Sequence, residues 1–219
     1  MHFKAADVAG LRIFYREAGD PSQPNIVLLH GFPSSSYSFH DLIPRLADRF
    51  HVIAPDYPGM GYSEAPSPTV LRPTFEDMVG AVDAFIAQCA PGPVILYMHD
   101  IGGPIGMRIA TAHPEKIAGL IFQNFTISVE GWNPDRLKVY ERLGGPETPE
   151  NLAEIEQFAT VDRDMFLHKR GARSQGIPRC SGSIAQDGVG RSRMAGAPIA
   201  ALREDKNPRR VVKELTGGG

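Results

Sequence analysis

The fold is decided by residues 94–103, which read VILYMHDIGG. The run 94–98 is continuously apolar, as expected of a strand that is buried on both faces. Asp100 and two glycines follow, and a helix is expected from about Pro104 to Ala112, with the proline in a first turn that needs no N–H there. A nucleophile that projects from a sheet sits best at such a sharp turn, and the helix N-terminus favours negative charge. Asp100 is therefore a candidate nucleophile, and the alternative is that it only caps the helix.

Strands and helices alternate along the chain on both sides of this stretch. The first 30 residues are expected to form strands, and a helix that begins at Thr74 is expected to carry a near-capping box with Asp77 at its third position. A further helix is expected over 39–46, and further strands over 51–54 and 117–122. This alternation predicts right-handed βαβ units and an α/β fold, with a mostly parallel sheet flanked by helices.

The composition changes twice after this core. Alternation stops at Asn124, and residues 125–170 are expected to form a helical segment with a helix start at Thr148. Residues 171–219 contain no Phe, Tyr or Trp, nine of the 23 glycines, and a local charge balance of +5. We therefore expect three parts: a core over 1–124, a helical segment over 125–170 and a poorly ordered tail over 171–219.

Composition also limits the partners that are expected. A net charge of −2 gives no reason to expect nucleic acid or an anionic membrane, and no apolar run approaches the roughly 20 residues that cross a bilayer. Cys89 and Cys180 are too few and too isolated for a disulfide framework or a metal site, and Cys89 is expected to be a buried, inert thiol. The expected setting is reducing and cytoplasmic.

Two further segments lie at the ends of expected strands. Residues 30–33 read HGFP, and residues 56–63 read DYPGMGYS. With the turn at Asp100, they resemble three motifs of the α/β-hydrolase superfamily, in the branch of epoxide hydrolases and haloalkane dehalogenases. The resemblance covers roughly residues 10–170 and implies an α/β-hydrolase core, incomplete at its C-terminal side, with a helical cap over 125–170.

The resemblance also implies a chemistry. Asp100 stands where most members carry serine, and members with Asp there form an alkyl-enzyme ester that a His-activated water hydrolyses, without cofactor or metal. The backbone N–H groups of Phe32 and Ile101 would form the oxyanion hole. A small apolar substrate is expected, an epoxide rather than a haloalkane. Haloalkane dehalogenases usually carry Trp where Ile101 stands, to hold the leaving halide. Epoxide hydrolases commonly have Trp there too, but cap tyrosines protonate their leaving oxygen. Tyr140, the one tyrosine in the expected cap, either donates this proton or only packs, and Trp132 either lines the pocket or packs.

Three departures keep other interpretations open. Met98 replaces the first glycine of the usual elbow motif, and the acid that should partner the histidine has no clear position. Relatives place the catalytic histidine near the end of the sheet, but none lies after residue 168; the seven are His2, His30, His40, His51, His99, His113 and His168. The chain could therefore be a catalytically incomplete, truncated or frame-shifted homologue whose exposed sheet edge favours self-association. Dinucleotide binding through residues 102–106 is a third interpretation, although their spacing is GGxxG rather than GxGxxG.

Overall fold

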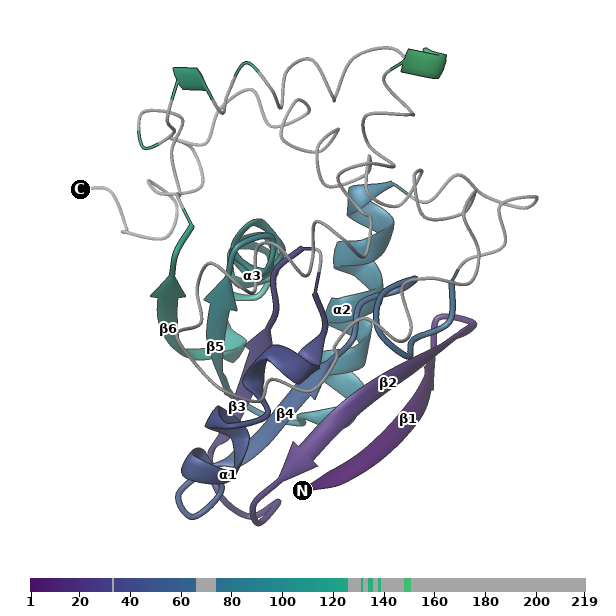
Figure 1. Ribbon diagram of the computed structural model, residues 1–219. Helices are drawn as coiled ribbons and strands as arrows, with labels where there is room; N and C mark the ends of the chain where they lie inside the picture. The colour runs from purple at the N-terminus through teal and green to yellow at the C-terminus, as the bar shows by residue number, and fades with distance from the viewer. Residues whose placement is uncertain are drawn as a thin grey trace, which may run out of the picture.

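The computed structural model describes residues 1–32, 34–65 and 74–125, with short pieces at 131, 134–135, 138 and 148–150. Its centre is a six-stranded sheet in the order β1-β2-β4-β3-β5-β6 (Figure 1). The strands are β1 (His2–Val8), β2 (Leu11–Ala18), β3 (Asn25–Leu29), β4 (His51–Pro55), β5 (Val94–His99) and β6 (Ile117–Gln123).

Four neighbouring strands of the sheet are parallel. The pairs β4–β3, β3–β5 and β5–β6 run parallel, whereas β1 and β2 add an antiparallel hairpin at the β4 side. This confirms the mostly parallel sheet that the alternation of strands and helices predicts. Because Leu29 pairs with Met98 in the β3–β5 ladder, the carboxyl ends of these two strands lie side by side.

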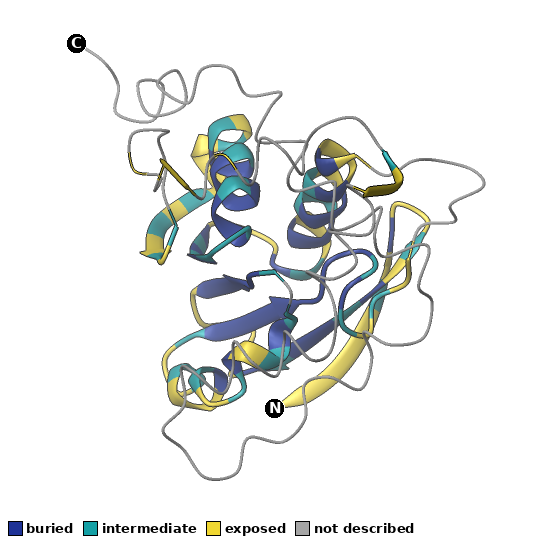
Figure 2. Ribbon diagram, turned by 45° about the horizontal axis from the view of Figure 1, so that its top comes forward, coloured by how far each residue is buried: buried dark blue, intermediate teal, exposed yellow. Residues whose placement is uncertain are grey.

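Helices cover both faces of the sheet (Figure 2). On one face lie α2 (Phe75–Cys89) and α3 (Gly102–Ala112), which bury side chains such as Phe85 and Ile105 against the sheet. The other face is covered by the short 3₁₀ helix η1 (Ser36–Phe39) and by α1 (Leu42–Leu46), whose Ile43 is fully buried. All five residues of β3 and of β4 are buried in consequence, as their apolar runs predict.

The structure confirms the expected start of one helix and divides another expected helix in two. Thr74 caps α2, and its side chain and that of Asp77 form a complete capping box. The helix expected over 39–46 is instead divided into η1 and α1. Pro44 gives the reason. It has no N–H to donate to the carbonyl of His40, so a helix that already includes residue 40 cannot continue through it, whereas in the first turn of α1 no such hydrogen bond is needed.

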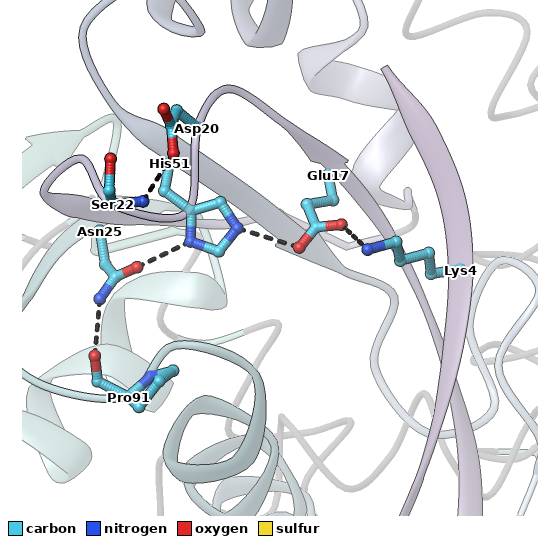
Figure 3. A network of polar contacts seen from close by, with 7 residues as sticks. All are labelled: Lys4, Glu17, Asp20, Ser22, Asn25, His51 and Pro91. Carbon is cyan, nitrogen blue, oxygen red and sulfur yellow. Dashed lines mark hydrogen bonds and ion pairs between the residues drawn. The ribbon is translucent and has the colours of Figure 1, made fainter.

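A polar network ties the strands together at the end of the sheet away from Asp100 (Figure 3). His51, at the start of β4, places Nδ1 2.8 Å from Oδ1 of Asn25 and Nε2 2.9 Å from Oε1 of Glu17. Asn25 donates its amide to the carbonyl of Pro91, at 3.0 Å, and Glu17 pairs with Lys4 on β1. One set of side chains therefore connects β1, β2, β4 and β3.

The two segments after the core lie almost wholly outside the described residues. Pro149 and Glu150 are helical, at the helix start expected near Thr148. Trp132, Tyr140, His168 and Cys180 fall outside the described residues, so the roles expected of them stay predictions. In the part of the chain that the structure describes, no helix is long and apolar enough to span a membrane.

Candidate functional site

Asp100 occupies the turn between β5 and α3. Its backbone φ is 51°, in the left-handed region that non-glycine residues seldom adopt. The turn is closed by a hydrogen bond of 2.9 Å from the Gly103 N–H to the Asp100 carbonyl. Ile101, not Asp100, is the N-cap of α3, and no side chain caps that helix. Asp100 therefore does not serve as a side-chain cap of α3.

The Asp100 carboxylate points toward the loop that follows β3. The Phe32 N–H donates a 2.9 Å hydrogen bond to Oδ1 of Asp100, across 68 residues of sequence. The parallel register of β3 and β5 makes this contact possible, because both loops leave the same edge of the sheet. Ile101 directly follows Asp100 in the turn. The three residues expected to form the site, Phe32, Asp100 and Ile101, thus lie together at one end of the sheet.

Close packing around the turn requires small residues. A Cβ atom on Gly31 would lie 2.7 Å from the Asp100 Cβ, and one on Gly102 would lie 2.4 Å from the Leu29 carbonyl oxygen. Met98, which stands where the family motif has glycine, is fully buried. Its side chain uses the space beside Gly106, where a Cβ would lie 2.5 Å from the Met98 sulfur. The departure at Met98 is therefore accommodated by a glycine one helical turn into α3.

Asp56, just after β4, organises the loops beside the site. Its carboxylate is fully buried and accepts hydrogen bonds from the backbone N–H groups of Ser36, at 2.7 Å, and Tyr62, at 2.9 Å. Its backbone carbonyl accepts a 2.7 Å bond from the Ser63 hydroxyl. Asp56 belongs to a recognisable sequence motif, but its partners follow from no local pattern, because they depend on how separate loops meet.

Five of the six described histidines have hydrogen-bond partners, and Asp100 is not among those partners. His99 places Nδ1 3.2 Å from the Gln123 carbonyl, and His113 places Nε2 3.0 Å from the Asp83 carboxylate. His51 lies in the network at the other end of the sheet, and His30 is fully buried beside Tyr57. Within residues 1–32, 34–65 and 74–125, no histidine nitrogen is hydrogen-bonded to Asp100.

Cys89 is partly rather than fully buried, on the face of α2 that packs against the sheet. Burial raises the pKa of its thiol, so the neutral form is favoured. Among the described residues, no three His, Cys, Asp or Glu side chains are grouped as a metal ion would require.

Comparison with known proteins assigns the family. Residues 24–145 match the family model described as the alpha/beta hydrolase fold. An uncharacterized hydrolase of Saccharomyces cerevisiae is 39% identical over 136 residues, which cover 60% of this chain and 46% of that protein. A haloalkane dehalogenase of Bradyrhizobium diazoefficiens is 32% identical over 132 residues, which cover 60% of this chain and 42% of the relative.

A solved structure, that of the epoxide hydrolase CorEH without ligand, matches with a TM-score of 0.71 and 25% identity, over 94% of this chain and 75% of that one. The chain spans about half the length of the curated relatives it matches. The matched family region contains both Phe32 and Asp100. The chain belongs to the α/β-hydrolase fold family, in the branch that includes haloalkane dehalogenases and epoxide hydrolases.

Proposed function

We propose that this chain carries the nucleophile side of a hydrolase that attacks a saturated carbon, with Asp100 as the nucleophile. The observation that carries the proposal is the 2.9 Å hydrogen bond from the Phe32 N–H to Oδ1 of Asp100, at a residue whose φ is 51°. A carboxylate held in a sparsely populated backbone conformation, with a backbone donor already directed at it, suits a preorganised nucleophile.

The first chemical step follows from this hydrogen bond. With Oδ1 held by Phe32, Oδ2 attacks the carbon and forms a C–O bond. The electron pair of the breaking bond leaves with the epoxide oxygen, which takes a proton from Tyr140, the candidate donor, or from solvent; from a haloalkane it leaves with the halide ion, which needs no proton. The product is an ester whose carbonyl oxygen is Oδ1. Water then attacks the carbonyl carbon of the ester, and negative charge develops on Oδ1. The Phe32 N–H, and in our proposal the Ile101 N–H, donate hydrogen bonds to that oxygen.

A small apolar epoxide is the substrate class that we favour, because Ile101 stands where haloalkane dehalogenases usually carry the Trp that holds the leaving halide. A haloalkane is the second candidate, because the relative from Bradyrhizobium diazoefficiens is named a haloalkane dehalogenase. Opening an epoxide releases no ion, whereas displacement from a haloalkane releases one halide for each ester. The two candidates are therefore separated by measuring halide release together with protein mass.

Ester hydrolysis also needs a general base, and no described histidine is bonded to Asp100. We therefore propose that the chain forms the ester more readily than it releases it, so that about one equivalent of label accumulates. A catalytically incomplete homologue remains the alternative, and it differs by showing no Asp100-dependent reaction at all.

The proposal is tested by intact-mass measurement after incubation with 1,2-epoxybutane or with 1-bromobutane. Both cysteines are first replaced by serine, since free thiols react with these reagents, and Asp100→Asn in the same background is the control. We expect a single mass increase that depends on Asp100. Equal labelling of the Asp100→Asn protein would contradict the proposal.

We also propose that the chain self-associates through the outer edge of β6. Within the described residues β6 pairs with only one strand, β5, and it exposes 41% of Ile121 and 49% of Phe122. An apolar strand with an open edge is a template for pairing with another chain.

A further inference from the structure

The peptide group between Gly31 and Phe32 is held at both of its ends. Its N–H, from Phe32, donates to Oδ1 of Asp100 at 2.9 Å. Its carbonyl oxygen, from Gly31, lies 2.8 Å from Nδ1 of His30. A peptide group is planar, so the direction of its carbonyl determines the direction of its N–H. Whatever holds the Gly31 carbonyl therefore also aims the Phe32 N–H.

The protonation state of His30 follows from its surroundings. A carbonyl oxygen only accepts hydrogen bonds, so Nδ1 must carry the hydrogen. The ring is fully buried, and burial lowers the pKa of His30 and favours the neutral form. Nε2 then has a free lone pair, and the Tyr57 N–H lies 3.4 Å from it as a donor. Both nitrogens of the neutral ring are thus matched to their neighbours.

Tyr57 holds the His30 residue in three places. Besides the backbone contact, its ring stacks on the imidazole with the ring centres 4.0 Å apart and the planes 20° from parallel. Its hydroxyl donates a 2.9 Å hydrogen bond to the His30 carbonyl. Burial, together with the charges of Asp100 and Asp56, raises the pKa of Tyr57, so the hydroxyl keeps its proton and remains a donor.

We infer that His30 and Tyr57 are positioning residues, which direct the Phe32 N–H at Asp100 by fixing the peptide group that carries it. His30 fixes the Gly31 carbonyl, and Tyr57 fixes both the ring and the backbone of His30. The importance of this arrangement for ester chemistry rests on the proposed function. The direction of the N–H is a property of the fold and can be measured without any reaction.

The test follows the Phe32 amide by NMR in full-length protein labelled with ¹⁵N-phenylalanine, where Phe32→Leu identifies the signal by its loss. His30→Leu removes the Nδ1 donor, and His30→Asn places an amide nitrogen near the same position. We expect His30→Leu to move the Phe32 proton upfield and to speed its exchange with solvent by roughly tenfold relative to the Phe85 amide, which reports global opening. His30→Asn should restore much of both values.

Tyr57→Phe keeps the stacked ring and removes only the hydroxyl, so it tests the inference even if His30→Leu does not fold. We expect Tyr57→Phe to move the Phe32 amide proton upfield by less than His30→Leu does. Tyr97→Phe is the matched control, because its hydroxyl bonds to Gln123 instead, and it should leave the Phe32 signal unchanged.

The outcomes separate this inference from the proposed function. A Phe32 amide that responds to the His30 and Tyr57 variants supports the inference, even if the wild-type chain is never alkylated at Asp100. An unchanged Phe32 amide in folded Tyr57→Phe and His30 variants overturns the inference, even if Asp100 is alkylated.

Discussion

At the scale of single residues, the backbone at Asp100 is in a conformation that costs a non-glycine residue about 1–3 kcal/mol. It is maintained by contacts from both sides. The Gly103 N–H bonds to the Asp100 carbonyl, and the Phe32 N–H bonds to its side chain. Gly31 completes the arrangement by presenting no side chain to the Asp100 Cβ.

Gly31→Ala should therefore damage the site. The added methyl group would lie 2.7 Å from the Asp100 Cβ, so the loop or the turn must move. We expect a loss of about 1–3 kcal/mol in unfolding free energy and at least a tenfold slower labelling of Asp100. Gly80→Ala, at an exposed and open position of α2, is the matched control and should stabilise by about 0.5–1 kcal/mol. Normal labelling of Gly31→Ala would show that the close packing does not matter.

Sequence and structure differ in what they reveal at this scale. The turn at Asp100 can be predicted from sequence, because an apolar run followed by small residues is a local pattern. The contacts of Tyr57 with His30 cannot, since they join residues that are 27 positions apart through a turn whose shape no local pattern specifies. The N-cap at Thr74 is likewise a local pattern, whereas the partners of Asp56 depend on how separate loops meet.

At the scale of elements, the network around His51 stabilises the starts of β3 and β4 (Figure 3). Glu17 is its charged centre, with a side chain that is only 12% exposed. Burial by itself would raise the pKa of Glu17, but hydrogen bonds and charges from Lys4 and His51 outweigh it. The pKa therefore lies below its ordinary value of 4.5.

This shift predicts how stability depends on pH. Because the folded pKa is lowered, the contribution of Glu17 is complete above about pH 4.5 and is lost as the pH falls through the folded pKa. We expect Glu17→Gln to reduce the unfolding free energy by about 1–3 kcal/mol near neutral pH, with a smaller difference from wild type near pH 3.5. Urea unfolding at both pH values measures this. A difference that stays constant with pH would refute a role for the Glu17 charge.

Elements with a strong local pattern are predictable, and those limited by a single residue are less so. The buried strands β3, β4 and β5 follow from apolar runs, and the start of α2 follows from Thr74 and Asp77. The helix expected over 39–46 is wrong as a single element. Its apolar spacing is right, but Pro44 cannot donate to the carbonyl of His40 and is accommodated only in the first turn of a new helix, α1.

At the scale of the whole molecule, the sheet has two outer strands of different character. β1 is exposed along most of its length but forms a hairpin with β2, whereas β6 is an apolar strand paired on one side within the described residues. Sedimentation velocity at increasing concentration should show association of the wild type. Ile121→Lys should abolish it, and Ala5→Lys, which adds the same charge on β1, should not. A monomer at all concentrations would rule this interface out.

The central claim is that Asp100 is the nucleophile, and peptide mapping by mass spectrometry after incubation with 1,2-epoxybutane tests it most directly. In the protein with both cysteines replaced, the account predicts that the added mass lies on Asp100 and is absent from the Asp100→Asn variant. Modification at other carboxylates, to the same extent in both proteins, would contradict the account.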